Sequence, residues 1–115
     1  MTNKAIAIAL KFAIENAGLS VLAVEPEHEW GANNRRTDVV VGTRYNCLIP
    51  DWDYEKIDII TSEISPSITP KALEQARASG QYISIGFEGL DVSCYVNKKG
   101  NFVTFPVANK AVIAK

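Results

Sequence analysis

The first stretch of the chain repeats apolar side chains with a helical period. Alanine, isoleucine, leucine and phenylalanine fill most positions from 4 to 17. The polar residues Lys4, Lys11 and Glu15 fall on one narrow stripe at about 100° per residue. Gly18 is a typical residue for ending a helix. The pattern predicts a helix over residues 4–17 that is the most buried element of the fold and packs against a sheet.

The next segments alternate between short β-prone runs and turn residues. Residues 19–24 predict a strand that ends at Glu25-Pro26, and residues 26–36 have the composition of a loop. The continuous valines of residues 37–43 predict a central strand covered on both faces. Two further strands are expected at residues 45–49 and 56–62.

The second half begins with a connector and a helix with clear end signals. Thr69 is a good capping residue, Pro70 suits the first turn, and Gly80 suits the end, so a helix is predicted over residues 70–79. Alternating apolar residues then predict strands at 81–87, 91–97 and 102–107, the last two joined by a tight turn. The element order is α-β-β-(β)-β-α-β-β-β. We therefore expect a single α/β (α+β) domain over residues 1–115, with a mixed central sheet of about five to seven strands and two helices.

Composition places the chain among ordinary globular domains. It has 115 residues, of which 47% are hydrophobic and 22% charged, with a net charge of −1. A membrane span needs about 20 consecutive apolar residues, and no run here approaches that length. We expect no membrane partner, a cytoplasmic location and no secretory signal. Cys47 and Cys94 match no metal-ligand spacing and are expected to be free thiols in a reducing compartment.

Charge is unevenly distributed along the chain. Residues 25–63 hold nine acidic against four basic residues, whereas the rest is mildly basic. Within this segment His28 stands among glutamates with no nucleophile beside it, which favours a solvated side chain. Acidic residues also alternate with two aromatic ones in the turn at 51–55. The pattern predicts a surface that contacts a basic partner through aromatic anchors, formed by Glu25, Glu27, Glu29, Asp51, Trp52, Asp53, Tyr54 and Glu55.

A second candidate site rests on carboxylates of neighbouring predicted strands. Asp38 opens one strand, and Asp58 lies within the next. Carboxylates that converge at strand ends could bind Mg²⁺, and such a cation can activate water against a phosphodiester. Whether these two aspartates converge is a question for the tertiary structure.

The element order and these two aspartates resemble the PD-(D/E)XK nucleases, the restriction-endonuclease-like fold. The resemblance implies that Asp38 and Asp58 match the metal-binding acids. It also implies that Glu15 matches the glutamate of the first helix and that Gln75 is an auxiliary polar group. The lysine of the motif is replaced by Ile60, so an ammonium that orients water is missing there.

The leading hypothesis is a small non-catalytic binding module, of the inhibitor or adaptor type that phages and mobile elements encode. It would contact a protein or a nucleic acid through the acidic, aromatic-containing surface, and it would need no cofactor. One alternative is a Mg²⁺-dependent nuclease that uses Asp38 and Asp58. Another alternative is a subunit of a symmetric assembly.

Overall fold

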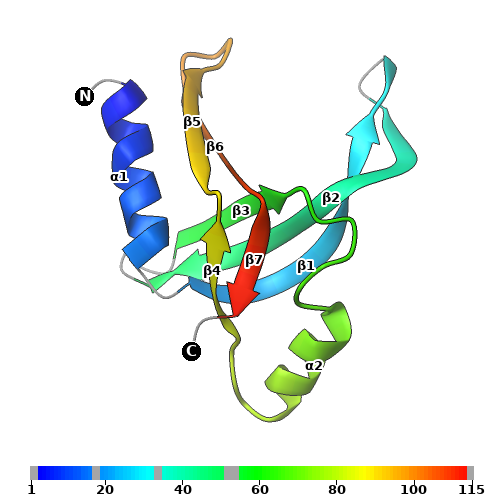
Figure 1. Ribbon diagram of the computed structural model, residues 1–115. Helices are drawn as coiled ribbons and strands as arrows, with labels where there is room; N and C mark the ends of the chain where they lie inside the picture. Colours follow the sequence, from blue (N-terminus) through cyan, green and yellow to red (C-terminus); the bar gives the residue numbers. More distant parts are fainter. Residues whose placement is uncertain (1–2, 17–18, 33–34, 51–54, 114–115) are drawn as a thin grey trace.

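The computed structural model describes residues 3–16, 19–32, 35–50 and 55–113 of the chain. These form one domain of mixed α+β class with two helices and a curled seven-stranded sheet, as predicted in outline (Figure 1). In chain order the elements are α1 (Asn3–Asn16), β1 (Leu19–Trp30), β2 (Arg36–Ile49), β3 (Glu55–Thr61), α2 (Pro70–Ala78), β4 (Ser84–Glu88), β5 (Asp91–Val96), β6 (Phe102–Ala108) and β7 (Lys110–Ile113).

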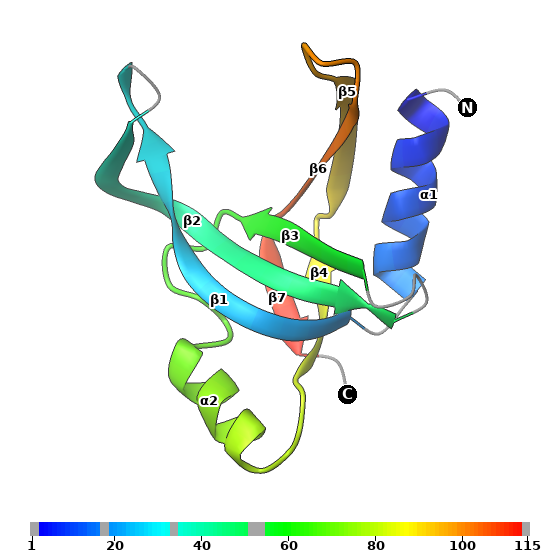
Figure 2. The same ribbon diagram turned by 180° about the vertical axis from the view of Figure 1, so that it is seen from behind.

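The seven strands lie in the order β5-β6-β3-β2-β1-β4-β7. Neighbouring strands are antiparallel except for β3 and β6, which pair in parallel through Ile60 and Thr61. Strands β4 and β7 cross one face of the β1–β3 layer, while no element of the described chain lies over the other face, which we call the uncovered face (Figures 1 and 2). The sheet thus folds over on itself and encloses the core between its own strands.

The core lies between the β1–β3 layer and the crossing strands. Tyr45 on β2 is fully buried and meets Phe87 of β4 edge to face, with ring centroids 5.9 Å apart. Such pairs of rings add to the burial of their surface. The thiol of Cys47 is also buried, and burial with a smaller effect of nearby Asp58 raises its pKa to about 12. The remaining core residues are Leu10, Ile14, Leu19, Val21, Val24, Ile49, Ile59, Ile68, Leu73, Ile85, Leu90, Val92, Ala108 and Ala111.

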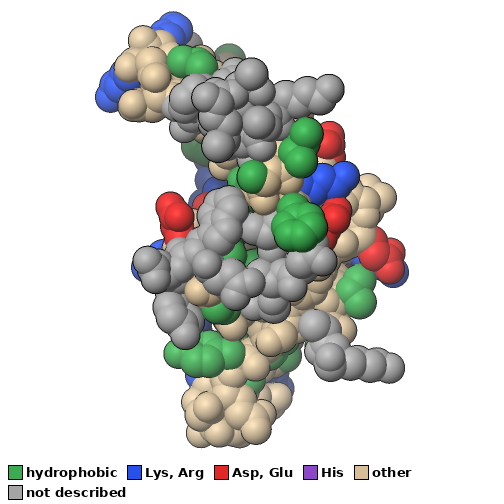
Figure 3. Space-filling model, turned by 90° about the vertical axis from the view of Figure 1, so that its left-hand side faces the viewer, with side chains coloured by type: hydrophobic (Ala, Val, Ile, Leu, Met, Phe, Trp, Pro, Cys, Tyr) green, Lys and Arg blue, Asp and Glu red, His purple; other side chains and the backbone are tan. Residues whose placement is uncertain are grey.

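Helix α1 lies at the periphery, and the prediction that it is the most buried element is wrong. It packs chiefly along the edge strand β5. Leu10 and Ile14 face the core, whereas Ile8 and Phe12 are 60% and 66% exposed. On the side of the molecule where α1 lies, hydrophobic side chains reach the surface beside charged ones (Figure 3). The described apolar residues of the helix are not all covered, because its contacts with strands β5, β4 and β6 lie on one side of it.

Strand β1 runs through the segment that the sequence predicted to be a loop. It continues past Pro26 to Trp30, which pairs with Arg36 of β2. Strand β4 pairs with β1 only at Leu19 and Ser20, so the rest of β1 has β2 as its single strand neighbour in the described chain. Proline has no backbone N–H and cannot donate a hydrogen bond to a neighbouring strand. It is tolerated on a strand that has an open side, because no hydrogen bond is needed there.

Strand β2 is one long strand where two short ones were predicted. Its second half, from Thr43 to Ile49, pairs with β3 and alternates cleanly between core and surface. Its first half does not: Val39 and Val41 are 53% and 45% exposed. The prediction of a valine run covered on both faces is therefore wrong, because this part of β2 extends beyond the sheet.

The second half of the chain follows the prediction more closely. Helix α2 begins at Pro70, and the Thr69 hydroxyl accepts a hydrogen bond of 3.1 Å from the backbone N–H of Ala72. Strand β4 begins at Ser84, three residues later than expected, and the seventh strand β7 was not predicted as a separate element. Neither helix of the described chain has the length and apolar character needed to span a membrane.

One carboxylate ties the loop between β3 and α2 to the sheet. Glu63 accepts hydrogen bonds from the Tyr45 hydroxyl at 3.0 Å, the Thr61 hydroxyl at 2.8 Å and the Ala111 backbone N–H at 3.0 Å. Its second oxygen accepts from the backbone N–H of Ser67 at 3.0 Å and from the Ser67 hydroxyl. We call these five residues the Glu63 cluster. Burial, and then Glu63, raise the pKa of Tyr45 to about 12, so its hydroxyl stays protonated and donates.

Candidate binding surface

The most unusual feature of the fold is a two-stranded ribbon that projects from the sheet. Among the described residues, strand β3 pairs with β2 only as far as Thr43, and beyond that point β2 continues with β1 alone (Figure 2). Gly42 stands where the ribbon departs, and a Cβ there would lie 2.1 Å from the carbonyl oxygen of Thr61. Only glycine allows this close approach of the two backbones. We call residues 25–31 and 35–41 the arm.

Three large apolar side chains of the arm are exposed. Trp30 is 61% exposed, Val39 53% and Val41 45%. The ladder between the arm's strands is irregular, with register shifts on both sides of His28. Bulges of this kind increase local twist and re-aim side chains. The result is an arm that presents apolar surface to solvent.

A charged network fixes the base of the arm. The Arg44 guanidinium donates from Nε to one Glu27 oxygen at 2.8 Å and from Nη2 to the other at 3.2 Å. Its Nη1 donates to Asp58 at 2.8 Å. Asn46 donates to the other Asp58 oxygen at 2.7 Å. The bond to Glu27 and then that to Asp58 raise the pKa of Arg44, against the opposing effect of burial. Three adjacent strands are thereby linked across the uncovered face of the sheet.

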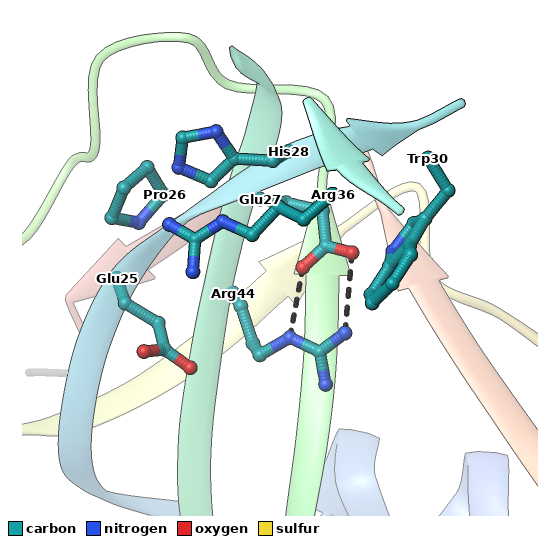
Figure 4. A pocket seen from close by; sticks show the side chains of 7 residues that line it. All are labelled: Glu25, Pro26, Glu27, His28, Trp30, Arg36 and Arg44. Carbon is teal, nitrogen blue, oxygen red and sulfur yellow. Dashed lines mark hydrogen bonds and ion pairs between the residues drawn. The ribbon is translucent and has the colours of Figure 1, made fainter. Parts of the chain in front are cut away.

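A hollow of about 320 Å³ lies beside this network, on the arm side (Figure 4). Arg36 extends across it toward Glu25 and Pro26. Neither Arg36 nor Glu25 has an ion-pair partner within the described residues. His28 also borders the hollow, and its Nδ1 atom is buried without a hydrogen-bond partner in the described part of the chain. The hollow therefore combines a fixed floor, the Glu27–Arg44 pair, with unpaired polar groups on its walls.

A second hollow of about 310 Å³ lies on the opposite side of Arg44, toward β6. Lys56, Ile60 and Phe105 are among its lining residues. Ile60 thus borders the uncovered face of the β1–β3 layer and is not part of the core. Arg44 separates the two hollows and belongs to both.

The structure does not bring the two candidate metal-binding aspartates together. Asp58 lies opposite Asn46 in the β2–β3 ladder. Asp38 lies eight residues away from Asn46 along β2, about 26 Å at the usual rise per residue. Asp38 belongs to the arm, whereas Asp58 is held by Arg44 and Asn46. Among the described residues no group of three His, Cys, Asp or Glu side chains is arranged to hold a metal ion.

The other residues of the nuclease resemblance lie elsewhere. Glu15 is on α1 and pairs with Lys11 at 3.9 Å, on the surface. Gln75 is an exposed residue of α2. Lys56, Asp58 and Ile60 line one hollow, but Asp38 is not among its residues.

The predicted acidic surface is only partly described. Asp51, Trp52, Asp53 and Tyr54 lie outside the described residues. Glu25 and Glu29 are exposed on the arm, and Glu55 is exposed at the start of β3. Glu27 is not a free surface charge, because its side chain is 14% exposed and both its oxygens are bonded to Arg44.

Sequence reasoning missed the residues that shape this surface. Arg44 and Asn46 alternate with buried Tyr45 and Cys47. The alternation indicates that Arg44 and Asn46 face away from the core. It does not indicate which carboxylates lie beside Arg44. Trp30 was obscured because its segment has the composition of a loop.

No protein family, curated protein or solved structure matches this chain.

The Arg44 network is expected to stabilise the sheet. We expect Arg44→Met to lower the free energy of unfolding by about 2 kcal/mol, because it leaves the poorly exposed Glu27 carboxylate without its partner. Arg36→Met is the matched control, since Arg36 has no ion pair within the described chain, and a change within about 0.5 kcal/mol is expected. Urea unfolding measures both. Equal costs for the two variants would show that the network contributes nothing to stability.

Proposed function

We propose that this chain is a non-catalytic protein-binding module whose contact element is the arm. The observation that carries the proposal is the exposure of Trp30 on one face of a ribbon that projects from the sheet, while Val39 and Val41 are exposed on the other face of the same ribbon. Tryptophan is the side chain most enriched among the energetically dominant residues of interfaces. Burial of its indole on a partner would supply the main favourable contribution to binding.

The chemistry of the candidate acids supports binding over catalysis. Both oxygens of Asp58 accept charge-assisted or amide hydrogen bonds, from Arg44 and from Asn46. A cation at Asp58 would have to displace the Arg44 guanidinium. The Asp58 carboxylate therefore stabilises the surface of the sheet through these hydrogen bonds. The network of which it is part holds the base of the arm in one orientation.

The charge of the arm favours a polypeptide over a nucleic acid as partner. The exposed charges of the arm are three acids, Glu25, Glu29 and Asp38, against two bases, Arg35 and Arg36, because Glu27 is paired with Arg44. A surface with a net negative charge repels a phosphate backbone, because nucleic-acid affinity depends on neutralising phosphates. An aromatic anchor flanked by charges of both signs suits a protein surface.

Selection from a random peptide library displayed on phage tests the proposal. The wild-type protein is immobilised at low density for the selection. The selected peptides are expected to bind the Trp30→Ala variant roughly tenfold or more weakly than they bind the wild type. Tyr82→Ala is the matched control, because Tyr82 is an aromatic residue outside the arm and is 66% exposed. Fluorescence polarisation of the labelled peptides gives the Kd values. Peptides that bind Trp30→Ala as tightly as the wild type would contradict the proposal.

A further inference from the structure

Strand β1 has an open edge along most of its length. Its first residues pair with β4, and the backbone N–H of Val21 donates to the Ile83 carbonyl at 2.9 Å. From Leu22 onward, no strand of the described chain pairs with this side of β1. An open edge presents backbone N–H and C=O groups that can pair with a further strand. Proteins commonly protect such an edge with lysine or proline, and residues 22–25 contain neither.

Helix α2 forms a wall beside this open edge. It lies on the side of β1 that faces away from β2 (Figures 1 and 2). A hollow of about 300 Å³ lies between the strand and the helix, and we call it the α2 groove. Its lining residues are Leu22, Ala23 and Val24 of β1 and Pro70, Leu73, Glu74 and Arg77 of α2. The four helix residues follow at spacings of three and four, so they share one face of α2.

The α2 groove combines an apolar base with charged walls. Val24 and Leu73 are 8% and 4% exposed, and Leu22 is half-buried. Glu74 and Arg77 are exposed, and neither has an ion-pair partner among the described residues. The groove can therefore accept one apolar side chain next to polar groups of a bound chain.

A single extended polypeptide suits the α2 groove better than a folded protein does. A strand added to β1 lies about 4.8 Å from it. Helix α2, about 10 Å across with its side chains, stands along the same edge. A folded domain, including a second copy of this chain, would have to bring its own strand past α2 to reach that distance. A nucleic acid lacks the repeating amide groups by which a strand edge pairs.

The open edge leads from the α2 groove to the arm. The groove ends on β1 at Val24, and the hollow beside the Arg44 network begins at Glu25 and extends to Trp30. Nine residues separate the two ends inclusively, and the distance from Leu22 to Trp30 is about 26 Å at the usual rise of a strand. Pro26 has no N–H, so strand pairing is confined to the four residues before it.

From the open edge, the groove and their continuity with the arm, we infer that the partner of the arm binds as an extended polypeptide segment. This segment adds a strand to β1 along residues 22–25, places one apolar side chain in the α2 groove and reaches Trp30. The inference rests on the proposed function, since it states how the partner of the same contact element is bound.

Filling the α2 groove tests the inference with the peptides selected on the wild-type protein. Glu74→Trp places an indole in the groove and is expected to weaken peptide binding about tenfold or more, because several main-chain hydrogen bonds are lost together. Gln75→Trp is the matched control, since Gln75 is exposed on the same helix and does not line the groove. Its Kd values from fluorescence polarisation should match the wild type. Both substitutions change exposed side chains, so the urea unfolding of both variants should also match.

Methylation of single backbone nitrogens of a selected peptide tests the strand itself. Successive N–H groups of a strand point to opposite sides, so only every second N–H of the bound segment faces β1. Over about four residues, alternate methylated positions are expected to weaken binding about tenfold, and the positions between them are expected to have little effect. This alternation is expected with the wild-type protein and should disappear with Glu74→Trp.

Two results would overturn the inference. They are equal binding by Glu74→Trp and Gln75→Trp, and methylation effects without the alternation. Peptides that require Trp30 but tolerate Glu74→Trp would reject strand addition and retain the proposed function. Peptides that tolerate Trp30→Ala but not Glu74→Trp would support the α2 groove and contradict the proposed function. A doubled mass of the peptide-free protein in light scattering, lost with Glu74→Trp, would assign the groove to a second copy and reject a segment of another protein.

Discussion

Glu63→Ala is expected to lower the free energy of unfolding by about 3 kcal/mol or more, because several buried donors lose their shared acceptor. The carboxylate accepts hydrogen bonds from Tyr45, Thr61, Ala111 and Ser67. Tyr45 is fully buried, so loss of the acceptor leaves its hydroxyl beside the core with one partner fewer. Urea unfolding at neutral pH measures the change.

Glu88→Ala is the matched control for this prediction. Glu88 pairs with Lys110 at 3.6 Å, and their side chains are 60% and 54% exposed. Exposed pairs contribute little because water screens them, so a cost within about 0.5 kcal/mol is expected. If the two alanine variants unfold at the same urea concentration, the Glu63 cluster has no structural role.

The same cluster makes stability depend on pH. Burial alone would raise the pKa of Glu63, but the hydrogen bonds from Ser67, Ala111, Thr61 and Tyr45 outweigh it and lower the pKa below the ordinary 4.5. The unfolded chain therefore takes up this proton at a higher pH than the folded protein does. The contribution is fully present above about pH 4.5 and is lost as pH falls through the folded-state pKa. Glu63→Gln should lose less stability than the wild type between neutral pH and about pH 3.

The second large effect is expected in α1, where two isoleucines of the same helix should differ sharply. Ile14 is 1% exposed and Ile8 is 60% exposed. We expect Ile14→Ala to cost about 2–5 kcal/mol, through lost burial and the cavity left behind. Ile8→Ala should stay within about 0.5 kcal/mol of the wild type, because it removes few contacts and alanine favours the helix.

Urea unfolding of both variants tests the position of α1. The two substitutions remove the same groups from the same element, so helix propensity cancels in their difference. Similar and large costs would show that α1 is surrounded by protein on both sides, as the apolar composition of the helix predicted. Similar and small costs would show that the helix does not contribute to the core.

Much of the local structure could be predicted from neighbouring residues. Thr69 and Pro70 determine where α2 begins, since cap and first turn are only a few residues apart. The alternation over residues 91–96 and the turn before Phe102 identified a hairpin whose strands pair from Asp91 with Val107 to Val96 with Phe102. The strand predicted over residues 56–62 was likewise found, at Glu55–Thr61. In each case the deciding interactions lie within one element or one turn.

The tertiary structure alone decided which apolar residues are covered. Valines at 39–41 predict a buried strand, but burial requires a neighbour, and β3 stops pairing at Thr43. The Glu63 cluster joins residues that are distant in sequence, including Ala111, 48 positions further along the chain. Arg44 meets Glu27 and Asp58 only because β1, β2 and β3 lie side by side. Periodicity shows which side chains share a face of an element, whereas the folding of the sheet on itself determines which faces meet protein and which meet water.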